Sequence, residues 1–197
     1  MTEYRRILLD GYPCEVVRDG DELVANDGRR VAITDATHLS PVEPTKIICI
    51  HLNYRSRVDE FMTKLPAAPT YFHKPITALN SHKGAVVRPE RCKWLHYEGE
   101  ICLMMLDGRV GAVGFGLDLT KRATQAKLKA AGLPWERSKA FTGSALFSDF
   151  VPAPKSLDQL GIELQVDGSL RQKGDVSLML YPPLIILQEL AQFCQLE

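Results

Sequence analysis

The stretch from residue 94 to residue 100, Trp-Leu-His-Tyr-Glu-Gly-Glu, carries two carboxylates two positions apart, Glu98 and Glu100. On a β-strand the side chains at positions i and i+2 point to the same face. Two carboxylates held side by side repel each other unless a cation lies between them. Oxygen ligands of this kind suit a hard divalent ion such as Mg²⁺, Mn²⁺ or Ca²⁺. The alternative interpretation is a solvent-facing pair on an edge strand, where exposed charges are common.

The neighbouring sequence extends this strand into a larger unit. We expect a strand over 94–105, a turn at 106–109 and a second strand over 110–119. The second strand is rich in glycine, which indicates that other backbone approaches it closely. Asp118 or Thr120 can cap a helix over 121–131, and Gly132 and Pro134 would end it.

The rest of the chain alternates short apolar runs with turn signals. Residues 1–45 indicate a small β-rich N-terminal unit, because Asp-Gly pairs at 10–11, 19–20 and 27–28 separate its apolar runs. Residues 46–197 would form the main domain. We expect its other elements at 46–51 (buried strand), 55–64 (helix with Val58, Phe61 and Met62 on one face), 70–75, 141–151, 161–166 and 178–181 (strands), 81–84 (polar turn) and 184–193 (helix). The predicted fold class is α+β, dominated by β-structure.

Composition excludes several classes of partner. The 24 basic and 24 acidic residues cancel, and no basic cluster indicates a nucleic acid or a membrane surface. The five cysteines are scattered and form no CxxC pair, which favours a reducing compartment over a disulfide framework or a zinc site. The N-terminus lacks the apolar run of a signal peptide, so we expect a cytoplasmic protein.

Six motifs in order give the chain a family resemblance. They are Asn-Tyr-Arg-Ser-Arg-Val-Asp-Glu (53–60), Phe-His-Lys-Pro (72–75), Tyr-Glu-Gly-Glu (97–100), Leu-Asp-Leu-Thr-Lys-Arg with Gln125 (117–122), Gly-Leu-Pro-Trp with Lys-Ala-Phe (132–135, 139–141) and Arg-Gln (171–172). Over 46–197 this order resembles the fumarylacetoacetate hydrolase family, in its acylpyruvate hydrolase, oxaloacetate decarboxylase and hydroxymuconate isomerase-like branch. The N-terminal unit is similar to the one that precedes the core in bacterial isomerase and decarboxylase members.

The resemblance implies a mixed β-roll or sandwich core, a homodimer and a divalent metal, usually Mg²⁺, with Mn²⁺ or Ca²⁺ as alternatives. It implies a small-molecule 2-oxo acid as substrate and an acylpyruvate- or fumarylpyruvate-type C–C bond cleavage through a metal-stabilised enolate. By motif match the metal ligands are Glu98, Glu100 and Asp118. The other implied site residues are Glu60, Lys139 and Arg57 as catalytic groups, and Arg122, Gln125, Asn53 and Tyr54 as substrate-binding groups.

Three departures from the family pattern keep alternatives open. Family hydrolases activate water with a His-x-x-Glu pair, and here Glu60 holds the Glu position but Arg57 holds the His position. Arginine stays protonated and cannot act as a general base, although it could grip a second substrate carboxylate. The connection between Glu100 and Asp118 is short, and the sequence given ends ahead of the family's Gly-Asp and Thr-Gly-Thr-Pro motif. Decarboxylation or isomerisation of oxo-dicarboxylates in aromatic catabolism, or an inactive scaffold, are therefore the alternatives.

Overall fold

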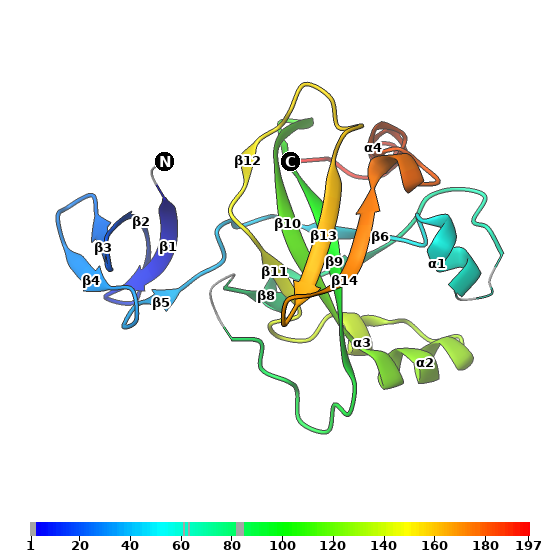
Figure 1. The fold of residues 1–197 in the computed structure, drawn as a ribbon, viewed down its shortest axis with the longest axis horizontal. Coiled ribbons are helices and arrows are strands. Elements are labelled where there is room, and N and C mark those ends of the chain that lie inside the picture. Colours follow the sequence, from blue (N-terminus) through cyan, green and yellow to red (C-terminus); the bar gives the residue numbers. More distant parts are fainter. Residues whose placement is uncertain (1–2, 61, 63, 82–84) are drawn as a thin grey trace.

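The computed structural model describes residues 3–60, 62, 64–81 and 85–197. Residues near the N-terminus form a separate five-stranded antiparallel sheet, at the left of Figure 1, with strand order β4-β3-β2-β1-β5. Ile7, Val16, Leu23 and Ala25 form its buried core. Tight turns at the three Asp-Gly pairs join the first four strands, which confirms the predicted hairpins. The strands are β1 (Tyr4–Leu9), β2 (Tyr12–Asp19), β3 (Glu22–Ala25), β4 (Arg30–Ala32) and β5 (Thr37–His38).

Two long antiparallel strands, β9 (Leu95–Leu106) and β10 (Arg109–Lys121), run through the centre of the main body (Figure 1). The sheet that contains β10 has the strand order β12-β10-β11-β8. Strand β9 also pairs with β10 in this sheet. The glycines of β10 allow close contacts, since a Cβ on Gly116 would lie 2.6 Å from Cys102 Sγ and 3.1 Å from the Leu146 carbonyl oxygen. The predicted close approach is confirmed. The short strands are β8 (Leu79–Asn80), β11 (Ala145–Phe147) and β12 (Val151–Pro152).

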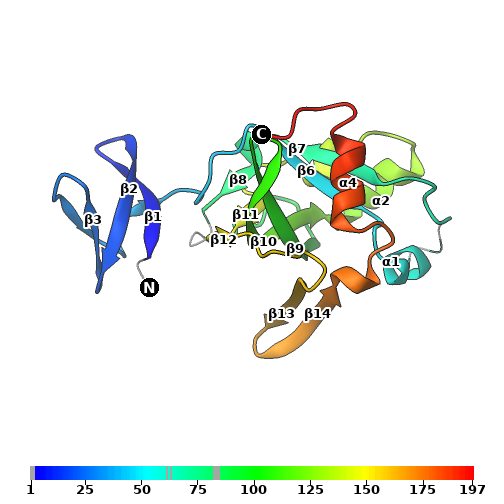
Figure 2. The same cartoon turned by 90° about the horizontal axis from the view of Figure 1, so that it is seen from above.

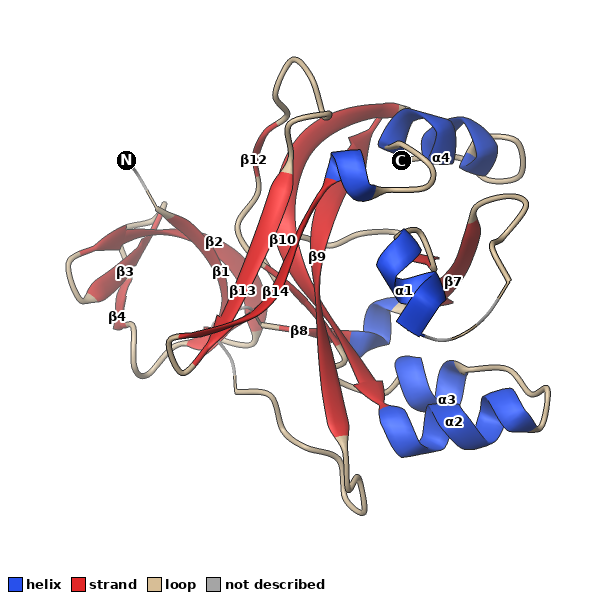
Figure 3. Ribbon diagram, turned by 45° about the vertical axis from the view of Figure 1, so that its right-hand side comes forward, coloured by secondary structure: helices blue, strands red, loops and turns tan. Residues whose placement is uncertain are grey.

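Two further hairpins and the helices complete the main body. Figure 3 shows the four α-helices on one side of the β9–β10 pair. Figure 2 shows the β13–β14 hairpin projecting from the main body. None of the helices in the described residues is long and apolar enough to cross a membrane. The remaining elements are β6 (Ile47–His51), β7 (Thr70–Lys74), β13 (Gly161–Val166), β14 (Ser169–Asp175), α1 (Arg55–Glu60), α2 (Arg122–Ala130), α3 (Glu136–Lys139), α4 (Pro183–Leu190) and two 3₁₀ turns (Ile76–Ala78, Val176–Leu178).

Several predicted element boundaries were wrong. Helix α1 ends at Glu60, and Met62 has a left-handed backbone (φ 47°) and a 94% exposed side chain, so it joins no helix face. No side chain caps α2, because β10 continues to Lys121. The strand expected over 178–181 is one isolated bridge between Met179 and Tyr54. The strand expected over 141–151 is reduced to β11 and the start of β12. Phe61 and most of the turn expected at 81–84 lie outside the described residues.

The β-dominated α+β class is confirmed, because strands hold more of the chain than helices do. The division of the chain at residue 45 stays a prediction.

Candidate active site on the β9–β10 pair

Three carboxylates share one face of the β9–β10 pair. Glu98 and Glu100 are two apart on β9, and Asp118 on β10 lies directly opposite Glu98. Side chains that are directly opposite each other in an antiparallel pair point to the same face. Asp118 is only 6% exposed, while Glu100 is exposed and lines a large cavity. The strand register therefore places on one face the three residues that the sequence nominated as metal ligands.

Lys139, the last residue of α3, reaches between two of these carboxylates. Its Nζ lies 2.6 Å from Glu98 Oε2 and 2.6 Å from Asp118 Oδ2. Burial by itself lowers the pKa of Lys139, but the charges of Asp118 and Glu98 outweigh it and raise the pKa above its ordinary value. Likewise, burial opposes ionisation of Glu98, but Lys139 lowers the pKa of Glu98 overall. Lys139 is therefore held as an ammonium ion beside the acidic face.

Lys74 is a second buried lysine, and it supports the same carboxylate from the other side. Its Nζ lies 2.9 Å from Asp118 Oδ1, and it donates hydrogen bonds to the carbonyl oxygens of Lys139 and Ser144. Burial lowers the pKa of Lys74 even though Asp118 opposes this effect. Lys74 lies in the Phe-His-Lys-Pro motif at 72–75, for which the sequence predicted no role. Its signal was a lysine at the end of an apolar strand next to proline.

Helix α1 contacts the acidic face through the ion pairs of Arg57. Arg57 lies 2.5 Å from Glu60 Oε2 and 3.2 Å from Glu98 Oε1. Thr120 donates a hydrogen bond to Glu98 Oε2 at 3.3 Å. Arg57 therefore links the α1 segment to the carboxylate pair, and no histidine takes this position.

The residues predicted to bind substrate occupy neighbouring positions. Arg122 donates a 2.6 Å hydrogen bond to Gln125 across one turn of α2. Asn53 uses both ends of its amide on the backbone of Tyr181, donating at 2.9 Å and accepting at 3.0 Å. Burial raises the pKa of Tyr54 to about 12, so this phenol stays protonated. Asn53 thus ties the start of α1 to the C-terminal segment, and its contact with substrate stays a prediction.

One cavity joins all of these groups. It has a volume of about 1070 Å³, and each of the ten predicted site residues contributes to its lining. Polar groups line the part near Glu98, whereas β6 and α4 supply apolar side chains elsewhere. All ten predicted residues therefore border one cavity, and the role of each stays a prediction.

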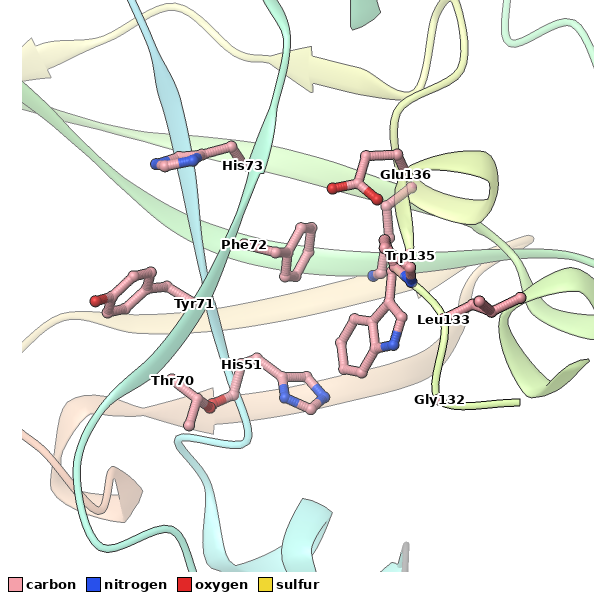
Figure 4. A pocket seen from close by; sticks show the side chains of 11 residues that line it. His51, Thr70, Tyr71, Phe72, His73, Gly132, Leu133, Trp135 and Glu136 are labelled. Carbon is pink, nitrogen blue, oxygen red and sulfur yellow. The ribbon is translucent and has the colours of Figure 1, made fainter. Parts of the chain in front are cut away.

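Lys139 also contributes to the lining of a smaller cavity of about 440 Å³, whose other lining side chains are shown in Figure 4. His51 and Trp135 form its wall, with ring centres 4.6 Å apart in an edge-to-face arrangement. Burial, and after it the charges of Lys129 and Lys139, lower the pKa of His51 to about 4. His51 is therefore neutral at pH 7.

The carboxylate oxygens of Glu98, Glu100 and Asp118 are the kind of donor that suits a hard divalent cation. Among the described residues no three His, Cys, Asp or Glu side chains are gathered into a ready-made metal cluster, and Lys139 supplies the positive charge between Glu98 and Asp118. Asp118 Oδ1 is buried and receives no well-directed hydrogen bond. Desolvation of its carboxyl group, and after it the charges of Asp118 and Glu98, raise the pKa of Glu100 to about 8, although the residue keeps an exposed surface. A cation near Glu100 would relieve this repulsion.

Fold and site together define a β-roll enzyme core with an acidic, oxygen-donor face. The chain matches the family described as "Fumarylacetoacetate (FAA) hydrolase C-terminal" over residues 46–197, and it belongs to that family. The relatives described below are enzymes of this family. The expected family resemblance and fold type are confirmed.

Three relatives of this family are similar to the chain in sequence or structure. The chain is 33% identical over 166 residues to the bovine oxaloacetate tautomerase FAHD1, mitochondrial, covering 77% of this chain and 74% of that protein. It is 29% identical over 167 residues to the Escherichia coli oxaloacetate tautomerase YcgM, covering 78% and 76%. The structure of fumarylpyruvate hydrolase from Pseudomonas aeruginosa in complex with Mn²⁺ and pyruvate is 27% identical, with a TM-score of 0.69 and coverage of 80% and 75%.

A fourth likeness concerns the fold alone. The structure of 5-carboxymethyl-2-hydroxymuconate delta-isomerase from Mycobacterium smegmatis covers 100% of this chain and 83% of its own, with 20% identity and a TM-score of 0.73. The N-terminal sheet is therefore part of the shared architecture.

Proposed function

We propose that this protein is an enzyme that uses a divalent metal ion to act on a 2-oxo acid at the carbon next to the oxo group. The observation that carries the proposal is the set of three carboxylates on one strand face, with the Lys139 ammonium 2.6 Å from two of them. Two kinds of relative support it: oxaloacetate tautomerases by sequence, and a fumarylpyruvate hydrolase with Mn²⁺ and pyruvate by structure.

The chain's own residues would divide the work. Glu98, Glu100 and Asp118 would hold the cation, which supplies Lewis-acid stabilisation of negative charge on the substrate oxygens. Lys139 Nζ carries a proton that a negatively charged substrate oxygen can accept as a hydrogen bond. Arg57 presents a guanidinium at the α1 side, where a second carboxylate of an oxo-dicarboxylate would form a paired hydrogen bond.

Between the possible reactions, we propose tautomerisation or decarboxylation ahead of hydrolysis. Hydrolysis needs a group that removes a proton from water, and Arg57 cannot do this. Glu60, the other member of the expected pair, is engaged with Arg57 at 2.5 Å. Hydrolysis of an acylpyruvate or fumarylpyruvate remains the second candidate, because the motifs of residues 117–141 match that branch.

The assay compares three substrates in parallel with Mg²⁺ or Mn²⁺. We expect loss of the enol absorbance of oxaloacetate, or release of pyruvate from oxaloacetate, to exceed turnover of acetylpyruvate and fumarylpyruvate. Glu98→Gln is the matched control that should remove metal-dependent turnover. Faster cleavage of fumarylpyruvate would select the hydrolase, and no turnover of any of the three would favour the inactive scaffold.

Metal binding can be measured without any substrate. At a concentration of 100 times the dissociation constant, Mn²⁺ that binds only the folded state adds about 2.7 kcal/mol, which raises the melting temperature of a domain of this size by about 5–10 °C. Thermal melting with and without Mn²⁺ checks this, with Glu98→Gln as the variant that should lose the shift. An equal shift in both proteins would contradict the proposed ligand set.

Arg57→Ala separates the dicarboxylate clamp from a purely structural ion pair. Losing a charge-assisted hydrogen bond to substrate costs about 1.5–3 kcal/mol, so we expect kcat/KM for oxaloacetate to fall about ten- to a hundredfold. Acetylpyruvate, which has one carboxylate, should be affected much less. Arg55→Ala on the same helix, outside the cavity lining, is the control. Equal losses for both substrates would rule out the clamp.

The homodimer implied by the family resemblance also stays a prediction. Size-exclusion chromatography coupled to light scattering measures the molar mass of the protein in solution and tests this prediction directly.

A further inference from the structure

The backbone between the two β9 carboxylates is held by a side chain instead of a strand. Gly99 donates its N–H to Gln172 Oε1 at 2.9 Å, and Gln172 Nε2 donates to the Gly99 carbonyl oxygen at 2.6 Å. On its other edge β9 pairs with β10. The primary amide of Gln172 therefore makes the two hydrogen bonds that a residue of a neighbouring strand would make.

The β13–β14 hairpin is shaped to deliver this amide. Its register shifts between Leu164 and Gln165, because Leu164 pairs with Gln172 while Gln165 pairs with Leu170. Arg171 is thereby left without a paired residue, as in a β-bulge. Bulges re-aim side chains and are common beside active sites. The bulged residue directly precedes Gln172, so the distortion lies where the strand must turn a side chain towards β9.

The absence of a side chain at residue 99 leaves room for this contact. Gly99 is buried, and a Cβ built on it would lie 3.2 Å from the Phe115 ring and 3.3 Å from Gln172 Oε1. Both distances are tighter than an ordinary van der Waals contact. Glycine therefore lets the Gln172 amide lie flat against the β9 backbone.

We propose that Gln172 is a positioning residue for the metal site: by fixing both backbone groups of Gly99, it sets the relative orientation of Glu98 and Glu100. Gln172 does so through its two hydrogen bonds to the Gly99 backbone. This inference depends on the proposed metal-binding role of the two glutamates. Hydrogen-bond partners that orient ligands typically contribute ten- to a hundredfold to metal affinity.

The test measures Mn²⁺ affinity directly, by electron paramagnetic resonance of the free ion, in the full chain. We expect Gln172→Met to weaken Mn²⁺ binding about ten- to a hundredfold, and Gln172→Asn, which keeps the amide but is one methylene too short, to weaken it as well. Gln165→Met is the matched control, because Gln165 is exposed on the same hairpin and outside the cavity lining. Melting without metal reports any purely structural effect separately.

The outcomes separate the two proposals. Wild-type Mn²⁺ affinity in Gln172→Asn or in folded Gln172→Met, together with a large loss in Glu98→Gln, would overturn the role of Gln172 and leave the metal site standing. A lower melting temperature with unchanged affinity would have the same meaning, since it shows a structural role only. Absence of Mn²⁺ binding in the unmodified protein would overturn both.

Discussion

Lys139→Met is expected to lower kcat about a hundred- to a thousandfold, the usual cost of removing one preorganised donor from a site that stabilises developing negative charge. The Lys139 ammonium is 3% exposed and lies 2.6 Å from Glu98 and Asp118. It is therefore fixed in place before any substrate arrives, and it needs no reorganisation during the reaction.

The same substitution should strengthen metal binding. In the unmodified protein Lys139 neutralises part of the charge of Glu98 and Asp118, so it competes electrostatically with a divalent cation. Without it, two largely buried carboxylates lose a partner, which is costly until a cation replaces it. We therefore expect Mn²⁺ to bind more tightly to Lys139→Met while kcat falls. A residue needed only for folding would not move these two quantities in opposite directions.

Lys127→Met on α2 is the matched control, because Lys127 is exposed and outside the cavity lining. Steady-state kinetics and Mn²⁺ titration of the two variants make the comparison. If Lys139→Met kept its kcat within a factor of a few, the proposed role of this ammonium would be wrong.

The strand register shows how far the sequence could predict the site. The Asp-Gly turn at 107–108 predicts a hairpin in which Leu106 faces Arg109, and that register would set Leu117 opposite Glu98. The observed register shifts by one residue between Val110 and Ala112, so Asp118 comes opposite Glu98 instead. A slip of one residue moves a side chain to the other face of a sheet. The bulge thus determines whether Asp118 lies on the same face as Glu98 and Glu100. No local sequence pattern predicted the bulge.

Features of the site that depend on neighbouring residues could be predicted from the sequence, whereas contacts between distant segments could not. The i, i+2 pair of glutamates and the Asp-Gly hairpins depend on neighbouring residues, and the sequence predicted them. Lys74 and Gln172 act across 44 and 73 residues, on Asp118 and Gly99 respectively. Their roles depend on which segments pack together, and the sequence motifs contained both residues without revealing a contact for either.

Lys74→Met is expected to cost about 3–5 kcal/mol of folding free energy, the range for breaking a buried ion pair by removing one partner. Lys74 is 2% exposed and lies 2.9 Å from Asp118 Oδ1. Its Nζ also donates to backbone carbonyls, including that of Lys139, so its loss leaves several buried acceptors without a donor. For a chain of this size the melting temperature should fall by about 10 °C. Lys64→Met, at an exposed position, is the control.

A double-mutant cycle shows whether Lys74 acts through Asp118. Asp118→Asn removes the charge that Lys74 neutralises, so the cost of Lys74→Met should shrink when Asp118→Asn is already present. Chemical denaturation of the four proteins without metal measures the coupling free energy. We expect a coupling of about 1–3 kcal/mol, within the range for residues in one ion-pair network. Additive costs would mean that Lys74 stabilises only the backbone carbonyls around Lys139, and that Asp118 is positioned by Lys139 alone.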